Sequence, residues 1–417
     1  MSVTLDQLAS HFDQSMRAYF SEDFPDCIGV AVSGGSDSLA TLFLTVQWCR
    51  DVGIDCRAVV IDHALRDQSS AEAKWVVQTA KNLGVPCSVM VWSHDGVSSN
   101  IQAQARTARY QLIDNWRGTI KHVVTGHTYD DQVETVLLRL KRGSGVDGLS
   151  GMSNHRDMRG ENGDWSLLRP NLTVERSVLR DYLNQLGQSW IDDPSNDNDI
   201  FDRVQMRRLI PQLHDYGITS QTIVKTADRM RRAQHALDHY TRELAETSVS
   251  IEYGDVVVDP NIFQTAPDDI QFRLLAQAIS WVGSNTYKPR FSALETARQV
   301  VEHGKAVNIA GTVVFQHKGK LRITREYEAI KSLEAHSHFD QRWSIACGPT
   351  EVIRPLGPEM ALTLDKSIRK LIPHRTLIVQ PAIFEGNELK SVPSLEPTSQ
   401  KGATFCGQDI FVSHLRH

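Results

Sequence analysis

The segment from Cys27 to Ala40 constrains the fold of this chain more than any other stretch. It begins with apolar and β-branched residues, passes through a Ser/Gly turn, and continues with apolar residues at helical spacing. This order is typical of a strand, a tight loop and a helix. The loop consists of Ser33, Gly34, Gly35, Ser36, Asp37 and Ser38. Its glycines permit a sharp turn that leaves backbone N–H groups at the positive end of the helix, so we expect a phosphate or pyrophosphate site.

The charge of this loop separates it from the lysine-containing phosphate loops. It has no lysine and so does not match G-x-x-x-x-G-K-[ST], but it contains Asp37. A carboxylate repels a phosphate unless a cation lies between them, and Mg²⁺ is the cation we expect. The alternative is an ordinary strand–helix turn that is capped by Ser36 or Ser38.

Length and composition are those of an ordinary globular protein. The 417 residues, of which 41% are hydrophobic, indicate about two or three domains. Because the net charge is −5, any contact with nucleic acid must use local basic patches. The six cysteines form no C-x-x-C pair, which favours reduced thiols over disulfides or a metal centre. We see no signal peptide and no apolar run of membrane-spanning length, and expect a cytoplasmic protein with no membrane contact.

Strand and helix patterns alternate through the first part of the chain. After a first helix at 4–20, strands are expected at 27–32, 56–62, 87–92 and 121–126, and helices at 37–50, 69–83, 100–117 and 129–141. Short apolar strands separated by helices predict an α/β fold with a doubly wound parallel sheet. Ligands of such sheets bind at the carboxyl ends of the strands. Three polar loops are expected there, namely 33–38, 62–66 and 126–131.

The remainder of the chain predicts a mainly helical middle domain and a small β-rich C-terminal domain. The expected boundaries are 1–212 for the catalytic domain, 213–332 for the middle domain and 342–417 for the C-terminal domain. Residues 152–165 are polar and rich in Gly and Asn, which is typical of a mobile loop. We expect a linker at 333–341, and strands at 376–380 and 389–392.

A second polar segment begins where the strand at 121–126 ends. On the helix that follows, Asp131 and Glu134 are three residues apart and therefore share a face, and Asp130 precedes them. These carboxylates are candidates to hold a metal or a substrate amine. The alternative is that they only stabilise the helix N-terminus.

Two further segments of the first domain are weaker candidates. His63 and Arg66 lie in one loop, where both could reach a nucleotide phosphate, although a plain surface loop explains them equally well. The segment 143–148 matches G-x-G-x-x-G, but it follows a helix rather than a strand. We therefore reject a dinucleotide site and expect a flexible loop there.

Arginines gather after residue 200 and form a modest basic zone in an acidic protein. The candidates for RNA contact are Arg203, Arg207, Arg208, Arg229, Arg231 and Arg232. A solvated helix face is the alternative, and the RNA interpretation requires these arginines to face the same side as the active-site loops.

Taken together, these segments resemble a known family. The loop at 33–38 resembles the PP-loop of the ATP-pyrophosphatase superfamily, and the full set is similar to bacterial tRNA(Ile)-lysidine synthases. The matching pieces are Asp62-His63-x-Leu65-Arg66, Gly126-His127-x-x-Asp130-Asp131-x-x-Glu134-Thr135, Arg139-Leu140-x-Arg142-Gly143-x-Gly145, Leu168-Arg169-Pro170 and Asp193-x-Ser195-Asn196. They span about 30–210. One departure is Arg203-Val204-Gln205-Met206-Arg207, where the family commonly has Arg-Asn-x-x-Arg.

The resemblance implies an ATP-dependent ligase. It would adenylate the C2 carbonyl oxygen of the wobble cytidine in tRNA(Ile) with a CAU anticodon, and the amine of L-lysine would then attack C2 and displace AMP to give lysidine. The loop 33–38 would hold pyrophosphate, Asp37 would bind Mg²⁺, and Asp131 and Glu134 would position lysine. His63, Arg66 and Arg169 would serve nucleotide or RNA phosphates. The basic zone would contact tRNA, and a homodimer is left open.

Three alternatives remain at this point. A PP-loop tRNA thiolase usually needs cysteines that this chain lacks at the expected rim. Another adenylating ligase, such as an amidating one, usually has an ammonia-supplying domain, and we find no such signature. A non-catalytic tRNA-binding protein would have no need of Asp37, Asp131 and Glu134.

Overall fold

The computed structural model describes most of the chain. The described residues are 4–20, 23–64, 68–93, 101–158, 160, 162–192, 202–285, 288–395 and 403–405. The chain divides into two compact units, Met1–Gln234 and His235–His417. Within the described residues, no helix combines the length and apolar character needed to cross a membrane.

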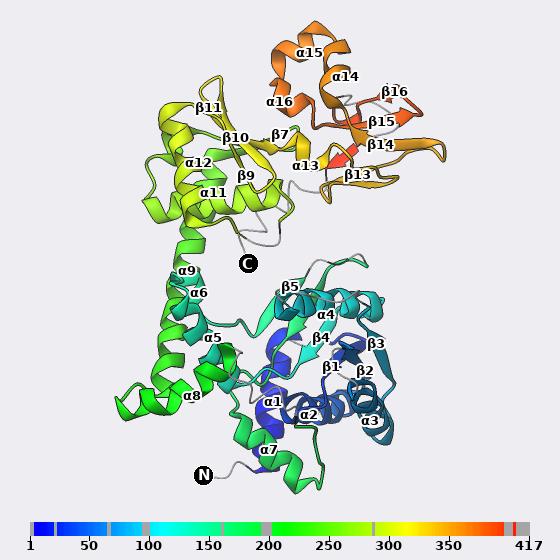
Figure 1. Ribbon diagram of the computed structural model, residues 1–417, viewed down its shortest axis with the longest axis vertical. Helices are drawn as coiled ribbons and strands as arrows, with labels where there is room; N and C mark the ends of the chain where they lie inside the picture. The colour runs from blue at the N-terminus through cyan, green and yellow to red at the C-terminus, as the bar shows by residue number, and fades with distance from the viewer. Residues whose placement is uncertain are drawn as a thin grey trace. The chain divides into compact units, whose positions relative to one another are not determined.

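The first unit is built on one six-stranded sheet with strand order β3-β2-β1-β4-β6-β5 (Figure 1). The strands are β1 (Cys27–Val32), β2 (Asp55–Asp62), β3 (Cys87–Val91), β4 (His122–Thr125), β5 (His155–Met158) and β6 (Trp165–Leu168). All neighbours pair in parallel except β5, which is antiparallel to β6. The predicted α/β fold with a doubly wound, mostly parallel sheet is confirmed.

Helices precede, join and follow these strands. They are α1 (Leu5–Phe20), α2 (Ser36–Val52), α3 (Ser69–Asn82), α4 (Ile101–Arg117), α5 (Tyr129–Lys141), α6 (Val146–Leu149), α7 (Arg176–Gln185), α8 (Asp202–Asp215) and α9 (Ser220–Ser248), of which α9 continues past Gln234 into the second unit. Side chains of α1, α2, α3 and α7 form the core on one face of the sheet, and α4 packs on the other.

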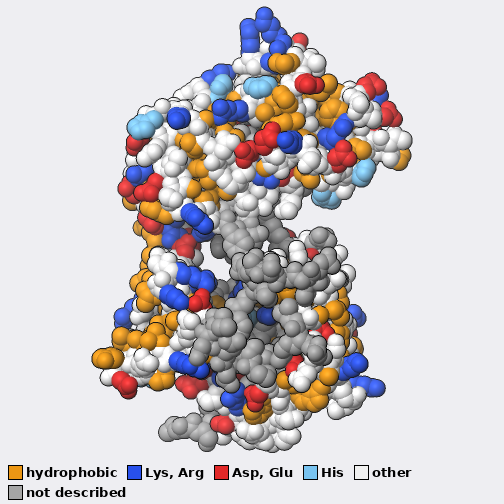
Figure 2. Space-filling model, in the orientation of Figure 1, with side chains coloured by type: hydrophobic (Ala, Val, Ile, Leu, Met, Phe, Trp, Pro, Cys, Tyr) orange, Lys and Arg blue, Asp and Glu red, His pale blue; other side chains and the backbone are white. Residues whose placement is uncertain are grey.

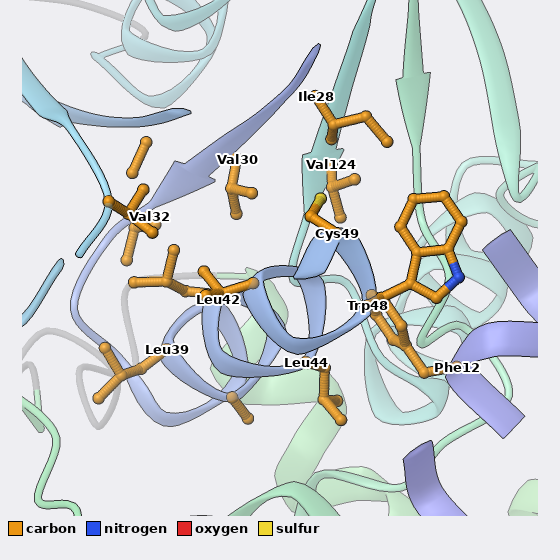
Figure 3. Close-up of a cluster of buried hydrophobic side chains, with 14 of the residues drawn as sticks. Phe12, Ile28, Val30, Val32, Leu39, Leu42, Leu44, Trp48, Cys49 and Val124 are labelled. Carbon is orange, nitrogen blue, oxygen red and sulfur yellow. The ribbon is translucent and has the colours of Figure 1, made fainter. Parts of the chain in front are cut away.

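The central strand β1 shows why this sequence folds as a buried parallel sheet. Val30 packs into one core and the next residue, Ala31, into the opposite one, because successive side chains of a strand alternate in direction. Figure 3 shows Val30 and Val32 of β1 on the side of Leu42 and Leu39 of α2, and Ile28 near Val124 and Cys49. Burying an aliphatic side chain of this size stabilises the fold by about 1.5–3 kcal/mol. The core thus fixes the loop between β1 and α2.

Some local expectations for the chain are wrong. Residues 152–165 were expected to be a loop, but β5 and β6 pair there as a hairpin at the sheet edge. A polar edge strand has a solvated face, which removes the apolar pattern on which strand prediction depends. Residues 376–380 were expected to be a strand, but the first two of them are the last two residues of helix α16 (His374–Leu377). Thr376 donates to the buried Asp255, so a tertiary contact outweighs local strand propensity.

The second unit contains three antiparallel sheets. Its first sheet has the order β7-β8-β11-β10-β9 and packs against α11 and α12 (Figure 1). The elements are β7 (Val249–Glu252), β8 (Asp255–Val258), α10 (Pro260–Phe263), α11 (Asp268–Val282), α12 (Phe291–His303), β9 (Val307–Ile309), β10 (Thr312–His317), β11 (Lys320–Arg325) and α13 (Tyr327–Ile330).

Two three-stranded sheets complete this unit, with orders β12-β13-β17 and β14-β15-β16. Their elements are β12 (His338–Phe339), β13 (Trp343–Ile345), β14 (Glu351–Pro355), α14 (Gly357–Thr363), α15 (Lys366–Leu371), α16, β15 (Pro381–Glu385), β16 (Glu388–Ser391), the 3₁₀ helix Pro393–Leu395 and β17 (Ala403–Phe405). The segment 333–341, expected to be a linker, contains β12 and is part of this β-rich region. The small β-rich C-terminal part is confirmed.

Candidate active site

The loop between β1 and α2 presents an uncapped helix N-terminus. Gly35 is the N-cap residue of α2, and no side chain makes a cap hydrogen bond there. Ser38 Oγ instead donates to the Gly35 carbonyl at 3.0 Å and accepts from the Ser33 N–H at 3.1 Å. The alternative that Ser36 or Ser38 merely caps the helix is therefore wrong. The first-turn N–H groups are left to a guest, and an anion suits them.

Two glycines are required for the shape of this loop. Gly34 has φ +89°, and a Cβ on it would lie 2.7 Å from Ile191 Cδ1. The Ile191 N–H also donates to the Gly34 carbonyl at 3.0 Å, which ties the loop to the segment after α7. A Cβ on Gly126 would lie 2.6 Å from the Ser38 Cα. Glycine thus lets the end of β4 approach the start of α2.

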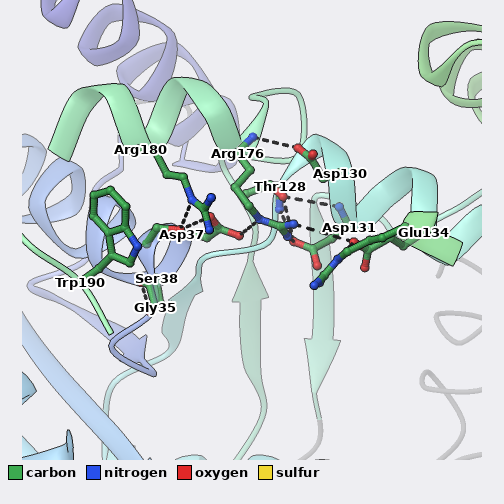
Figure 4. A network of polar contacts seen from close by, with 12 residues as sticks. Gly35, Asp37, Ser38, Thr128, Asp130, Asp131, Glu134, Arg176, Arg180 and Trp190 are labelled. Carbon is green, nitrogen blue, oxygen red and sulfur yellow. Dashed lines mark hydrogen bonds and ion pairs between the residues drawn. The ribbon is translucent and has the colours of Figure 1, made fainter. Parts of the chain in front are cut away.

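Asp37, in the first turn of α2, is paired with an arginine from another helix. Arg176 Nε, at the start of α7, donates to Asp37 Oδ2 at 2.7 Å (Figure 4). Burial raises the pKa of the Asp37 carboxyl, and the Arg176 charge offsets only part of that rise. The same pairing raises the pKa of Arg176 above its ordinary value although burial opposes it. Asp37 thus has a cation as its neighbour.

Asp131 takes part both in the cap of α5 and in an ion pair with another helix. Its Oδ2 accepts from the Thr128 N–H at 2.9 Å in a capping box at the start of α5, so the helix-capping alternative is correct as a local description. Its Oδ1 lies 3.4 Å from Arg203 Nη1 of α8. Burial alone would raise the pKa of Asp131. The potential of neighbouring groups, with His127 and Arg203 foremost, lowers it below its ordinary value.

Glu134 lies one turn further along α5 and is fully buried. Its Oε1 accepts from Arg207 Nε of α8 at 2.5 Å. Within the described part of the chain, its Oε2 has no hydrogen-bond partner. Burial raises the pKa of Glu134, and the contact with Arg207 only partly counters this. Arg203 and Arg207 thus reach the carboxylates despite the family departure between them, where Val204 is a buried apolar residue.

A cavity opens beside these acids in the same unit. Its volume is about 470 Å³, and its lining residues are Asp130, Arg176, Ser177, Arg180, Asp181, Asn184 and Trp190. The guanidinium of Arg180 lies over the Trp190 ring, 5.7 Å from its centroid, and its Nε is 3.3 Å from Ser36 Oγ. Figure 4 shows this arginine next to the Asp37 loop. Asp130 is thus the α5 acid that lines the cavity, and Arg176 and Arg180 link its wall to Asp37 and to Ser36.

Of the two loop residues His63 and Arg66, the structure describes only His63. His63 follows β2, and its Nε2 lies 3.4 Å from Arg109 Nη2. Burial, assisted by the charge of Arg109, lowers the pKa of His63 to about 4, so this imidazole is neutral at pH 7. Arg66 lies outside the described residues, as do the matching residues at 193–196.

The arginines expected to contact tRNA differ in their exposure and in their hydrogen-bond partners. Arg169 is 3% exposed, and its Nη1 donates to the Ser153 carbonyl at 2.6 Å. Arg231 donates to Asp228 and to the Ser150 carbonyl. Arg229 and Arg232 are exposed on α9. On the face shown in Figure 2, the described Lys and Arg side chains are interspersed with Asp and Glu rather than gathered in one field.

Sequence reasoning missed Arg176 and Arg180, which bring α7 to the loop. Arg176 is the first residue of α7, and the first turn of this helix has no acidic residue. A cation at a helix N-terminus opposes the helix dipole, so it needs acids from elsewhere. That anomaly is the signal that could have identified Arg176.

The comparisons with known proteins agree with this site. Residues 8–213 match the family model described as a PP-loop domain, so the first unit belongs to the class of PP-loop ATP-binding proteins. The tRNA(Ile)-lysidine synthase of Ruegeria pomeroyi is 34% identical to this chain, covering 94% of it and 93% of the relative. That of Wolbachia pipientis wMel is 33% identical and covers 79% and 80%. The chain belongs to the tRNA(Ile)-lysidine synthase family, which confirms the resemblance.

Proposed function

We propose that this chain joins L-lysine to C2 of the wobble cytidine of tRNA(Ile) with a CAU anticodon. ATP would adenylate the C2 oxygen and release pyrophosphate, and the lysine amine would then displace AMP to give lysidine. The observation that supports this most is the family membership over nearly the whole chain. ATP, lysine and tRNA are cytoplasmic molecules, so we expect the chain to act there.

The loop and Asp37 supply what the first step needs. The N–H groups at the start of α2 would hold the pyrophosphate moiety of ATP. Among the described residues no three metal-ligating side chains converge, which fits Mg²⁺ because this ion is usually held by one or two carboxylates and the substrate phosphates. Asp37 would be that carboxylate. When bound, Mg²⁺ neutralises charge that develops on the departing pyrophosphate.

The second step needs an amine that is held in place. Asp131 and Glu134 lie on one face of α5 and would orient the lysine ammonium group through charge-assisted hydrogen bonds. The chemistry requires no covalent nucleophile from the protein. Catalysis would come from positioning of the amine and from electrostatic stabilisation of the leaving groups.

A labelling experiment tests this function. The purified protein, ATP, Mg²⁺ and labelled lysine are expected to label a transcript of tRNA(Ile) with a CAU anticodon. The matched control is the same transcript with uridine at the wobble position, which we expect to stay unlabelled. Absence of label from the cytidine transcript, with folded protein that binds ATP, would refute the assignment.

The exposed arginines of α9 provide a test of the RNA surface. Arg229→Ala combined with Arg232→Ala is expected to weaken tRNA binding and to reduce the slope of log Kd against log salt by about one per lost phosphate contact. Binding is measured by filter retention at several salt concentrations. Arg231→Ala is the matched comparison. Its guanidinium bonds to Asp228 and to backbone, so we expect lower stability and an unchanged slope. An unchanged slope in the double variant would remove this face from the RNA surface.

A further inference from the structure

One guanidinium links the acids that were assigned to two different ligands. Besides the 2.7 Å contact with Asp37, Arg176 Nη2 lies 3.6 Å from Asp131 Oδ2 and Nη1 lies 3.9 Å from Glu134 Oε1. Figure 4 shows this side chain reaching from α7 between Asp37 on one side and the two α5 acids on the other. Arg176 therefore occupies a position to which both the proposed metal and the proposed ammonium group would be attracted.

The surroundings of Arg176 indicate more than a structural ion pair. Asp131 and Glu134 each have a second arginine, from α8, so Arg176 is not their sole compensation. The Arg176 side chain keeps 19% of its surface exposed, and it lines the cavity of about 470 Å³. Its guanidinium thus has space to leave the carboxylates. Its backbone N–H donates to Asp130 Oδ2 at 2.8 Å, which fixes the point from which the side chain moves.

The charges of the ligands determine which of them can displace this guanidinium. Three carboxylates and three guanidinium groups meet at the site, so their formal charges cancel. Free lysine has a net charge of +1, because its two ammonium groups outweigh its one carboxylate, and the ammonium group that approaches the α5 acids competes with Arg176 for the same oxygens. ATP with Mg²⁺ brings a cation for Asp37 and also phosphate oxygens, which attract guanidinium groups strongly.

We propose that Arg176 makes the binding of the amino acid depend on the nucleotide. In the ligand-free protein its guanidinium occupies the carboxylates of Asp131 and Glu134 and excludes the lysine ammonium group. Once nucleotide lies on the loop, Arg176 turns from Asp37 to the phosphates and vacates the α5 acids. The inference rests on the proposed function, because it takes lysine as the amine substrate. Arg176 is by this account a positioning residue that orders the two binding events.

Calorimetric titration of lysine measures this dependence without turnover. The probe nucleotide is α,β-methylene ATP with Mg²⁺, which cannot release pyrophosphate. For the unaltered protein we expect lysine to bind about 5–150-fold more tightly with the nucleotide than without it. In Arg176→Gln the two affinities should be equal, because lysine binding without nucleotide becomes tighter. A purely structural role would instead weaken lysine binding under both conditions.

Two further variants sharpen the test. Arg17→Gln removes an exposed arginine of α1 that pairs with Asp13 rather than with the site acids, and should leave the ratio of the two lysine affinities at the unaltered value. Arg176→Lys retains a charge but cannot span Asp37 and Asp131 together, so its ratio should fall below that of the unaltered protein. Thermal melting checks that each variant is folded. If Arg176→Gln does not fold, the affinity ratio of Arg176→Lys tests the inference instead.

The outcomes separate this inference from the proposed function. If lysine binds and labels tRNA but the affinity ratio persists in both Arg176 variants, the inference is wrong and the function stands. If lysine binds the unaltered protein equally tightly with and without the nucleotide analogue, the inference is likewise wrong and the function stands. If lysine neither binds nor labels tRNA under any condition, while the nucleotide analogue binds, the function fails and the inference with it.

Discussion

Asp37→Asn is expected to abolish exchange of labelled pyrophosphate into ATP, in the presence of tRNA, while tRNA binding survives. Asp37 is the carboxylate at the uncapped start of α2, next to the N–H groups that would hold the pyrophosphate. Asparagine has nearly the same shape, but it is neutral and a weaker ligand for Mg²⁺. Loss of one group that stabilises charge in the transition state commonly lowers rates by about 10²–10³-fold. We expect a loss of at least about 100-fold.

Asp51→Asn is the matched control for this substitution. Asp51 is on the same helix, but it is exposed at the far end, where it accepts from Gln47. Exchange by this variant should equal that of the unaltered protein. If Asp37→Asn instead lost tRNA binding and kept exchange, Asp37 would belong to the RNA surface rather than to the nucleotide site.

The strand–loop–helix core of the first unit could be predicted because its pattern is local. The expected strand at 27–32 matches β1, and the expected helix at 37–50 lies within α2. These elements are buried on both faces, so their apolar residues follow each other closely in sequence. Prediction failed where burial depends on distant partners. The sequences of the β5–β6 hairpin and of α16 are polar or lack a clear periodicity. Their secondary structure is determined by contacts with distant parts of the chain.

The candidate site was predictable only in part, for a related reason. Asp37, Asp131 and Glu134 lie on helices that begin shortly after predicted strands end, at the edge of a parallel sheet where its loops converge. Arg176 lies 139 residues from Asp37 along the chain, and no periodicity links the two. Arg169 was taken from the family resemblance and Arg231 from the basic zone, and the structure directs both toward backbone carbonyls. The charge of an arginine in the sequence does not indicate whether its side chain faces solvent or bonds to backbone carbonyls.

Glu134 is the site acid whose environment would change most if an amine bound beside it. It is completely buried, and one of its oxygens has no partner among the described residues. An unpaired oxygen of a buried carboxylate is costly, because the charge has lost its water without full compensation. An ammonium group would supply the missing donor and charge. Lysine binding would therefore relieve a cost that the ligand-free site carries.

Glu134→Gln is accordingly expected to raise the KM for lysine by at least about 100-fold, with a much smaller effect on pyrophosphate exchange, since breaking a buried ion pair costs about 3–5 kcal/mol and each 1.4 kcal/mol is a factor of ten. The KM is measured from labelled lysine incorporated at saturating ATP and tRNA. Because the pKa of Glu134 is raised, it takes up a proton at a higher pH than an ordinary glutamate. As the solution is acidified, lysine affinity should thus begin to decline at a pH above 4.5, the ordinary pKa of glutamate. Glu134→Gln should lack this decline. Glu175→Gln, which alters an exposed glutamate before α7, should change neither quantity. An unchanged KM in Glu134→Gln would place the amine elsewhere.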